Sequence, residues 1–474
     1  MRKNTLHRTR VRGTCLICTA IFLLAGLCYS QPTISVSPAE GPPTTELTIA
    51  GSGFAANAKI DLYFDSKYEG LATGNAKGSF SGINISVPST ALPGDHKVRA
   101  VQVSGAATAQ KIFLVRTNWS EFHRGNMMRW NPYENVINVN NVANLQLKWS
   151  YMIGAMSASP AVANGVVYAA TWTGLLYAFN ANTGSVLWTY QTASTGQNNA
   201  SAAVANGIVY FGAIDGLFYA LNASTGGKLW TYQTGADIES SATVVDGVVF
   251  IGSNDKYVYA LNATTGSLVW KFVTGGKVTC SPAVENGVVY LGSYDGYIYA
   301  LNASTGAKLW SHYVGGPYDP YFVSASPAVV NGVVYVQGGN TNLVYALKAS
   351  TGAEIWSQSI SAGYPPVSSP AVANGIVYIG SGGGDLYAMD ASTGAILWTY
   401  STGNRVSTSP AVANGVVYFG TNNWIFYAAN AKTGAILWSY DVIDSVGPSP
   451  SIANGMAYVG DGNGTLYAFA LPKN

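Results

Sequence analysis

Short alternating apolar segments, separated by Gly, Asn and Asp, recur along most of the chain. Within residues 281–314 the runs SPAVE, VVYLGS, YIYALN and AKLWSHYV follow one another. Asn286-Gly287 separates the first two runs, and this pair favours a tight hairpin because both positions accept positive φ. Asp295-Gly296 and the ASTG of residues 303–306 separate the later runs. The pattern therefore predicts a unit of four antiparallel strands.

Two independent markers show how often this unit recurs. The first marker is a tryptophan in the fourth run, found at Trp149, Trp188, Trp230, Trp270, Trp310, Trp356, Trp398 and Trp438. The second is SPAVANG or a close variant, which begins at Ser159, Ser201, Ser241, Ser281, Ser326, Ser369, Ser409 and Ser449. Spacings near 40 residues with four strands each are typical of propeller blades. Both markers predict an all-β, eight-bladed β-propeller over residues 141–474.

The phase of the two markers predicts how the ring closes. Trp149 precedes the first SPAV segment, and the last unit ends near Leu471 with no tryptophan strand after it. The strand around Trp149 is therefore expected to complete the last blade. This pairing removes the open sheet edges that β-proteins must otherwise protect.

Residues 31–116 lack the repeat and are predicted to form a separate small β-sandwich. Alternating segments there cover residues 33–36, 46–50, 60–64, 83–87, 97–103 and 111–115. The stretch ISVSPAEGPPTTELTIAGSGF, residues 34–54, resembles the opening of IPT/TIG-type immunoglobulin-like domains, which implies a spacer or binding module. Residues 117–140 form a connector, whose aromatic side chains, Trp119 and Trp130 among them, are expected to pack against the propeller.

Residues 1–30 read as a secretory signal peptide. A basic stretch precedes the apolar residues 15–27, which are too few to span a membrane stably. Cleavage is expected before Gln31, which leaves no transmembrane segment and places the protein in the periplasm or outside the cell. The alternative is a lipoprotein anchored through Cys28; Leu27 disfavours it, because a small residue is expected just before a lipidated cysteine.

Charge and cysteine content limit the classes of function. Charged residues make up 10% of the chain, with 24 Lys and Arg against 22 Asp and Glu. Loss of five basic residues with the signal leaves 19 against 22, so no basic stripe for nucleic acid is expected. Only Cys280 remains after cleavage, so an internal disulfide is excluded. A monomer is expected.

The blade motif carries a resemblance to a known family. The pattern A-x-T-G-x-x-x-W, as in ASTGGKLW at residues 223–230, resembles the PQQ-like repeat and recurs along the propeller. The resemblance implies an eight-bladed propeller in which each tryptophan docks between neighbouring blades. The family includes quinoprotein alcohol dehydrogenase-like enzymes, the BamB subunit of the outer-membrane assembly machinery and many other exported proteins. The fold therefore does not decide the function.

Two functions from different classes remain open. The first is an exported, non-catalytic scaffold, without cofactor, that presents a propeller face to a protein, glycan or cell-envelope partner. The alternative is a PQQ-dependent oxidoreductase, resembling alcohol or sugar dehydrogenases, with PQQ and calcium in the central channel. The vicinal cysteine pair that this resemblance implies cannot form with one mature cysteine. No catalytic residue carries over by motif, and the additional N-terminal domain and poor lipidation signal depart from BamB.

Loops that vary from blade to blade are where binding residues collect on a rigid frame. The blade-to-blade loops predict a polar channel mouth with the binding candidates Asp237, Glu239, Lys277, Tyr318, Asp319, Tyr321, Arg405 and Asp444, together with Gln197, Asn198, Asn199 and Tyr364. The plainer interpretation is the polar lining of a wet channel. Asp237 and Glu239 are candidates for a carboxylate pair or cation ligands, or for two acids offset by Lys277 and Arg405.

Two further tryptophans break the repeat. Trp172 and Trp424 lie in the turns between the second and third strands, where exposed aromatics suit a sugar or protein surface. The alternative is packing beneath the N-terminal domain. The histidines His96, His123 and His312 show no metal-ligand spacing, so no metal site is expected.

Overall fold

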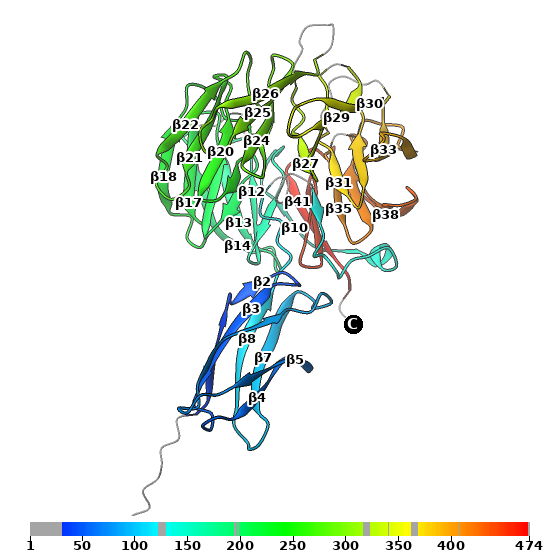
Figure 1. The fold of residues 1–474 in the computed structure, drawn as a ribbon. Helices are drawn as coiled ribbons and strands as arrows, with labels where there is room; N and C mark the ends of the chain where they lie inside the picture. The colour runs from blue at the N-terminus through cyan, green and yellow to red at the C-terminus, as the bar shows by residue number, and fades with distance from the viewer. Residues whose placement is uncertain are drawn as a thin grey trace, which may run out of the picture.

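The computed structural model describes residues 31–121, 129–193, 196, 199–315, 323–339, 341–361, 368–406 and 408–472. These residues are almost entirely strands and turns, with one short 3-10 helix, η1 (Val142–Asn144). A propeller forms the larger part, and a smaller sandwich stands below it (Figure 1). The prediction of an all-β propeller is confirmed. The predicted signal peptide, residues 1–30, lies outside the described residues.

The N-terminal sandwich consists of two sheets packed on one apolar core. The first sheet has the strand order β1 (Thr33–Ser37), β3 (Glu46–Ser52), β6 (Phe80–Ser86). The second has the order β2 (Glu40–Gly41), β8 (Thr108–Val115), β7 (Gly94–Gln102), β4 (Lys59–Phe64), β5 (Lys67–Thr73). Inward-facing residues such as Leu47, Ile60 and Phe113 are wholly buried. The alternating pattern located six of these strands and missed β2 and β5.

Eight further sheets, counted over the described residues, form the propeller blades. Blade 1 has β11 (Ala161–Ala163), β12 (Val166–Ala170), β13 (Leu175–Asn180) and β14 (Val186–Gln191); blade 2 has β15 (Ala203–Ala205), β16 (Ile208–Gly212), β17 (Leu217–Asn222) and β18 (Lys228–Gln233). Blade 3 has β19 (Thr243–Val245), β20 (Val248–Gly252), β21 (Tyr257–Asn262) and β22 (Leu268–Val273); blade 4 has β23 (Ala283–Glu285), β24 (Val288–Gly292), β25 (Tyr297–Asn302) and β26 (Lys308–Tyr313). Blade 5 has β27 (Ala328–Val330), β28 (Val333–Gln337), β29 (Leu343–Lys348) and β30 (Glu354–Ser359); blade 6 has β31 (Ala371–Ala373), β32 (Ile376–Gly380), β33 (Asp385–Asp390) and β34 (Ile396–Ser401). Blade 7 has β35 (Ala411–Ala413), β36 (Val416–Gly420), β37 (Ile425–Asn430) and β38 (Ile436–Asp441).

Blade 8 closes the ring with strands from both ends of the repeat array. It comprises β39 (Ser451–Ala453), β40 (Met456–Gly460), β41 (Thr465–Ala470) and β10 (Gln146–Met152). The N-terminal strand β10 pairs antiparallel with β41 from Gln146↔Ala470 to Met152↔Thr465. The predicted closure through the strand around Trp149 is thus confirmed.

Each blade tryptophan joins its blade to the next one. The Trp270 indole N–H donates to the Ala303 carbonyl at 2.8 Å, and its ring lies against Gly306. A Cβ on Gly306 would lie 2.7 Å from that ring, so glycine is required there. The same bond joins Trp149 to Ala181, Trp188 to Ala223, Trp230 to Ala263, Trp310 to Ala349, Trp356 to Ala391 and Trp398 to Ala431.

The ring closure changes this contact in one place. In blade 8 the outer strand β10 comes from the start of the repeat array and its neighbour β41 from the end, so no A-x-T-G turn joins these two strands. The Trp438 indole N–H therefore donates to the carbonyl of Leu145, directly after η1, at 3.1 Å. The segment directly before β10 thus supplies the acceptor that a repeat turn provides in the other blades.

A closed ring of hydrogen bonds runs through the serines of the SPAV motif. The backbone N–H of each serine donates to the hydroxyl oxygen of the serine in the next blade, at 2.9–3.1 Å. The order is Ser159, Ser201, Ser241, Ser281, Ser326, Ser369, Ser409, Ser449 and back to Ser159. All eight serines are buried. The marker used to count blades is therefore also a side-chain belt that holds the inner strands together.

The connector enters the propeller instead of bridging two separate bodies. Its strand β9 (Trp130–Asn131) pairs parallel with the inner strand β35, and Trp119 pairs with Val162 of β11. The wholly buried Arg129 donates from Nε to the Pro410 carbonyl at 2.8 Å and from Nη2 to the Pro450 carbonyl at 2.7 Å. These bonds satisfy backbone carbonyls just before the inner strands β35 and β39.

The buried Glu134 carboxylate fixes the next part of the connector. It accepts bonds from the backbone N–H groups of Val136, Ile137 and Gly455 and from the Thr117 hydroxyl. Burial raises the pKa of this carboxyl, and the hydrogen bonds oppose that rise. Connector and propeller therefore form one packed unit.

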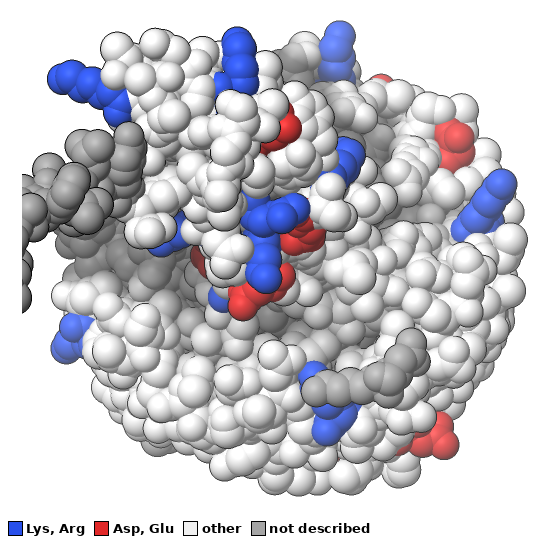
Figure 2. Space-filling model, turned by 90° about the horizontal axis from the view of Figure 1, so that it is seen from below, with Lys and Arg blue, Asp and Glu red and all other residues white. Residues whose placement is uncertain are grey.

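The two ends of the propeller differ in their loops. The hairpin face carries the Asn-Gly hairpins and A-x-T-G turns; the variable face carries the second-to-third-strand turns and the blade-to-blade loops. The sandwich and connector contact the hairpin face, where Asn118 and Asn164 exchange hydrogen bonds and Asn135 donates to Ala91 in the sandwich. Viewed from this side, the surface shows only scattered charged side chains of both signs (Figure 2). The variable face lies at the opposite end of the propeller from the sandwich.

Candidate functional site

The mouth on the variable face is built from a repeated backbone contact. In several blades, the turn between the second and third strands donates an N–H to a carbonyl in the preceding blade-to-blade loop. Asn254 donates to Asp237 at 2.9 Å, and Tyr294 donates to Lys277 at 2.9 Å. Trp172 donates to Ala155, Asn422 to Arg405 and Gly462 to Ser445 in the same way. These bonds hold the variable loops on the rigid blades.

One layer of side chains lies two residues before the serine ring on the chain. It includes Ser157, Asn199, Glu239, Thr279, Ser324 and Gly447. Extended residues i and i+2 point the same way, so this layer stands above the ring at the mouth. Glu239 is the one carboxylate among these six positions.

Glu239 is the centre of a polar network at the mouth. Its Oε1 accepts a bond from Asn254 Nδ2 at 2.7 Å, and its Oε2 accepts one from Asn199 Nδ2 at 3.2 Å. The Ser157 hydroxyl donates to Asn199 Oδ1, and the Trp172 indole N–H donates to Ser157 Oγ at 3.0 Å. Of the sequence candidates, the structure thus brings together Glu239, Asn199 and Trp172.

Asp237 and Glu239 do not form a carboxylate pair. The segment precedes strand β19, which begins at Thr243, and the Asp237 side chain is exposed while Glu239 is partly buried. Lys277 occupies the position of Asp237 in the next loop and is also exposed. Among the described residues no ion pair joins Glu239 to Lys277 or Arg405. The expected offset of these acids by these two cations is therefore not seen.

The other predicted rim residues lie apart from this network. Arg405 is partly buried between blades 6 and 7, and burial lowers the pKa of its guanidinium. Asp444 lies between blades 7 and 8 and accepts the Ser445 backbone N–H at 2.6 Å. Tyr318, Asp319, Tyr321, Gln197, Asn198 and Tyr364 lie outside the described residues.

The sequence reasoning missed Asn254, a residue of the network, and Thr279, which follows Glu239 in the layer at the mouth. Asn254 had only the appearance of a turn residue, and Thr279 drew no attention because threonine is common in strands. Asn254 Oδ1 and Thr279 Oγ1 are both buried and have no hydrogen-bond partner among the described residues. Val278 N–H donates to the Ser253 carbonyl at 3.1 Å, which sets the two residues side by side. Buried polar atoms without partners are rare and indicate a missing ligand or water.

Trp172 and Trp424 differ in their environments. Trp172 is partly buried and tied into the network through Ser157. Trp424 is 54% exposed and has φ 69°, a left-handed conformation that bulky residues rarely adopt. Glycine occupies the matching turn position at Gly216, Gly296 and Gly384, whereas Lys256 (φ 77°) and Asn342 (φ 53°) hold it in blades 3 and 5, all with positive φ. Neither tryptophan packs under the N-terminal sandwich, which contacts the other face.

The described residues do not fit PQQ and calcium at this mouth. Ca²⁺ takes about six to eight oxygen ligands, and PQQ is an anionic group that needs cations. No group of three His, Cys, Asp or Glu side chains gathers anywhere in the described residues, and Glu239 is the one carboxylate of its network. Cys280 is buried against the Gly292 backbone, and burial raises the pKa of its thiol to about 12.

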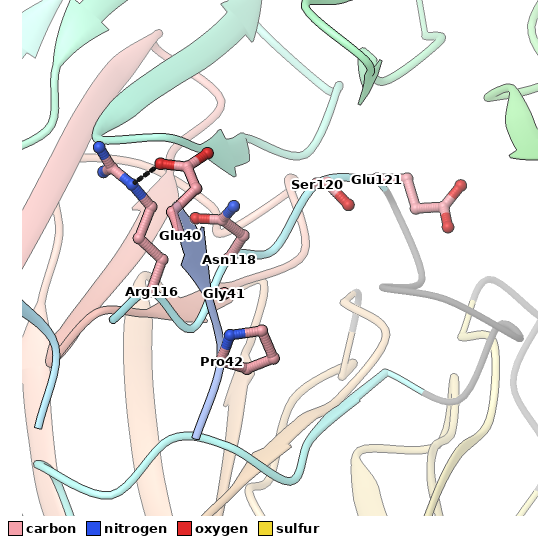
Figure 3. Close-up of a pocket in the computed structure, with 7 residues that line it drawn as sticks. All are labelled: Glu40, Gly41, Pro42, Arg116, Asn118, Ser120 and Glu121. Atoms are coloured by element: carbon pink, nitrogen blue, oxygen red, sulfur yellow. Dashed lines mark hydrogen bonds and ion pairs between the residues drawn. The ribbon is translucent and has the colours of Figure 1, made fainter. Parts of the chain in front are cut away.

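Away from the mouth, a cavity lies at the junction of the sandwich and the propeller. It has a volume of about 390 Å³ and is lined by Glu40, Gly41, Pro42, Arg116, Asn118, Ser120 and Glu121 (Figure 3). The Arg116 guanidinium donates from Nε to Glu40 at 3.0 Å across one wall. Its neighbour Asn118 is held by Asn164 of blade 1. The cavity therefore belongs to the joint that positions the sandwich.

Comparison with known proteins identifies the class of propeller. The family model described as outer membrane protein assembly factor BamB matches residues 119–244, 235–364 and 340–472. No curated protein matches the sequence. Within the described residues, no helix has the length and apolar character needed to cross a membrane.

Solved structures share the fold at low sequence identity. Quinohemoprotein alcohol dehydrogenase ADHIIG from Pseudomonas putida HK5 is 19% identical, with a TM-score of 0.66 over 75% of this chain and 80% of that one. BamB from Moraxella catarrhalis is 20% identical, with a TM-score of 0.60 over 69% of this chain and 99% of that one. A europium-containing methanol dehydrogenase is 17% identical, with a TM-score of 0.65 over 75% and 98%. At these identities the likeness concerns the fold alone.

Proposed function

We propose, on the premise that this chain belongs to the family of the outer membrane protein assembly factor BamB, that it is an exported, non-catalytic scaffold. Its variable face binds a protein partner in the cell envelope. The immunoglobulin-like domain, residues 31–116, and the connector, residues 117–140, act as a spacer on the opposite face of the propeller, residues 141–474. Export rests on the signal pattern of residues 1–30.

The conformation of Trp424 is the observation that carries this proposal. A non-glycine residue in the left-handed region costs about 1–3 kcal/mol; most of the matching turns avoid this cost with glycine, Asn342 lowers it with a residue that tolerates this region, and only Lys256 is a comparably long side chain there. The indole is also more than half exposed, so packing recovers only part of the cost. A residue that costs conformational free energy and is exposed to solvent is best explained by a contact with another molecule.

A second exposed apolar side chain lies beside Trp424. The backbone N–H of Val442 donates to the Trp424 carbonyl at 2.8 Å, which brings Ile443 next to this turn. Ile443 is 61% exposed. Trp424 and Ile443, here called the Trp424 patch, present an aromatic and an aliphatic side chain together, and tryptophan is enriched among the residues that contribute most to binding at protein–protein interfaces.

The position of the sandwich also supports the variable face as the partner-binding surface. Thr117 and Asn454 exchange hydrogen bonds, so the end of the sandwich is fixed at the hairpin face of blade 8. A spacer attached there leaves the variable face open to a partner. The Glu239 network adds polar groups at the centre of that face, where they can give specificity to a contact anchored by apolar residues.

Site-specific photocrosslinking in the native host tests the proposal. A photoreactive residue in place of Ile443 should give one discrete adduct with an envelope protein. The matched control is the same residue in place of Ser304, which is exposed on the hairpin face of blade 4. Trp424→Asn should abolish the Ile443 adduct without unfolding the protein, because Asn342 holds the matching turn position at φ 53°. Adducts from position 304 alone, or an adduct unaffected by Trp424→Asn, would contradict the proposal.

A cofactor assay separates the scaffold from an oxidoreductase. The purified protein, supplied with PQQ and Ca²⁺, should show no dye-linked oxidation of alcohols or sugars. Tight PQQ binding accompanied by such oxidation would refute the non-catalytic function.

A further inference from the structure

The Glu239 network contains acceptors that the described chain does not satisfy. Glu239 is partly buried and carries a carboxylate whose oxygens receive only amide hydrogens, from Asn199 and Asn254. No Lys, Arg or His of the described residues lies within 4 Å of it. A partly buried carboxylate with no cation beside it attracts positive charge, so the site favours a positively charged ligand.

Two neutral oxygens stand beside this carboxylate. Asn254 turns its amide nitrogen to Glu239, which leaves its buried Oδ1 as an acceptor without a donor. Thr279 is one blade further around the mouth, and Ser241 and Ser281, each two residues beyond Glu239 and Thr279, are bonded to each other. The buried Thr279 Oγ1 also has no partner among the described residues. The equivalent residues of adjacent blades, Ser157 with Asn199 and Asn199 with Glu239, are bonded to each other, so the Thr279 hydroxyl follows Glu239 in the same layer around the mouth.

We infer that this site, formed by Glu239, Asn254 and Thr279, binds a primary ammonium group. An ammonium has three donors and one positive charge, which match three separate oxygen acceptors and the uncompensated carboxylate. A guanidinium prefers the two oxygens of one carboxylate, whereas the acceptors here belong to three different side chains. A neutral sugar would leave the charge uncompensated, and a divalent metal needs more oxygens than these residues supply.

This inference deepens the proposed function, on which it rests, because it places a specificity site at the centre of the partner-binding face. The ammonium is carried by a lysine side chain of the partner or by a small amine. Both sources offer the same chemistry to Glu239.

Ligand-observed NMR and calorimetry with the mature protein test the inference. The probes are n-butylammonium, Nα-acetyl-lysine amide and its Nε-acetylated form. The two ammonium probes should bind and the Nε-acetylated probe should not, because acetylation removes the charge and two donors. Tighter binding of the lysine derivative than of butylammonium assigns the site to a protein side chain, and the reverse order assigns it to a small amine.

Substitutions identify the site. Glu239→Gln keeps the size of the side chain and should weaken ammonium binding by about tenfold or more. Thr279→Val keeps both shape and the Glu239 network and should weaken it by several-fold. The matched control is Asp237→Asn, which removes a similar charge from an exposed residue two positions away and should leave binding unchanged within about twofold.

Three results would overturn the inference: no binding of either ammonium probe, equal loss in Asp237→Asn and Glu239→Gln, or Ca²⁺ displacing the probes at lower concentration. The crosslink from position 443 is measured independently of Glu239. If that crosslink persists while ammonium binding fails, the ammonium site is refuted and the scaffold function stands. If the crosslink fails, the scaffold function is refuted whatever the probes do.

Discussion

The serine ring makes a sharp prediction about how the inner strands are held. Ser281→Ala removes one hydroxyl and with it the acceptor for the Ser241 backbone N–H, which lies 3.1 Å from Ser281 Oγ. The Ser281 N–H keeps its own bond to Ser326 Oγ at 2.9 Å, so one link of the ring is lost.

The expected cost follows from burial. Ser241 is 5% exposed and Ser281 is 4% exposed, so water cannot readily replace the lost acceptor. A buried N–H left without a partner costs about 1–3 kcal/mol, and we expect Ser281→Ala to lower the free energy of unfolding by this amount. The Ser241 amide should also exchange with deuterium faster, because its bond is the one removed.

The assay combines urea unfolding with native-state hydrogen exchange. Ser304→Ala is the matched control, since Ser304 lies in an exposed turn of the same blade and its own N–H bonds to Asn302. The control should stay within about 0.5 kcal/mol of the parent protein. If Ser281→Ala matches the control in stability and leaves the Ser241 amide protected, the ring does not hold the blades together.

Three further predictions concern the frame around the site. Deleting residues 141–152 removes β10 and the Leu145 acceptor of Trp438, so unfolding in urea should begin at much lower concentration; an unchanged midpoint would refute closure by β10. Gly306→Ala should cost more than about 1 kcal/mol in urea unfolding, because its φ is 71° and the new Cβ would meet the Trp270 ring, whereas Gly332→Ala, with φ 76° and open space, should cost less. Burial raises the pKa of Glu134 above its usual value of 4.5, so ionising it opposes folding, and stability should fall as pH rises from about 4.5 through the folded-state pKa. Glu134→Gln should remove this pH dependence, and a slope that persists in the variant would assign it to another group.

The repeat was readable from the sequence because its determinants are local. Each Asn-Gly hairpin, such as Asn286-Gly287 with φ 49° and 74°, fixes its own two strands, and alternation fixes which side chains turn inward. Ring closure was also readable, because the phase of Trp149 against Ser159 leaves one strand unpaired at each end. These features need no knowledge of distant contacts.

The burial of the connector inside the propeller was not predicted, because it depends on contacts that are distant in sequence. Aromatic residues predicted packing, but Arg129 and Glu134 are bound by Pro410, Pro450 and Gly455, more than 280 residues away in sequence. No local pattern indicates which backbone groups such residues will meet. Arg129 and Glu134 are nevertheless conspicuous as charges in a chain with few of them.

The candidate site shows the same division. The polar rim, including Glu239, was predicted because it breaks the repeat. Its partner Asn254 is an ordinary turn residue in type, and only the packing of the turn in blade 3 against the preceding loop places it beside the carboxylate. The break in the repeat identified Glu239 from the sequence, whereas its neighbours could be identified only from the packing in the structure.

Hydrogen–deuterium exchange of the protein with and without its crosslinked partner tests the central claim most directly. The account predicts that partner binding protects the turn at residues 421–425 and the loop at residues 442–446, which together carry the Trp424 patch. It predicts no protection at the hairpin-face turns, such as residues 303–306. Protection confined to the hairpin face or to the N-terminal sandwich would contradict the assignment of the variable face as the binding surface.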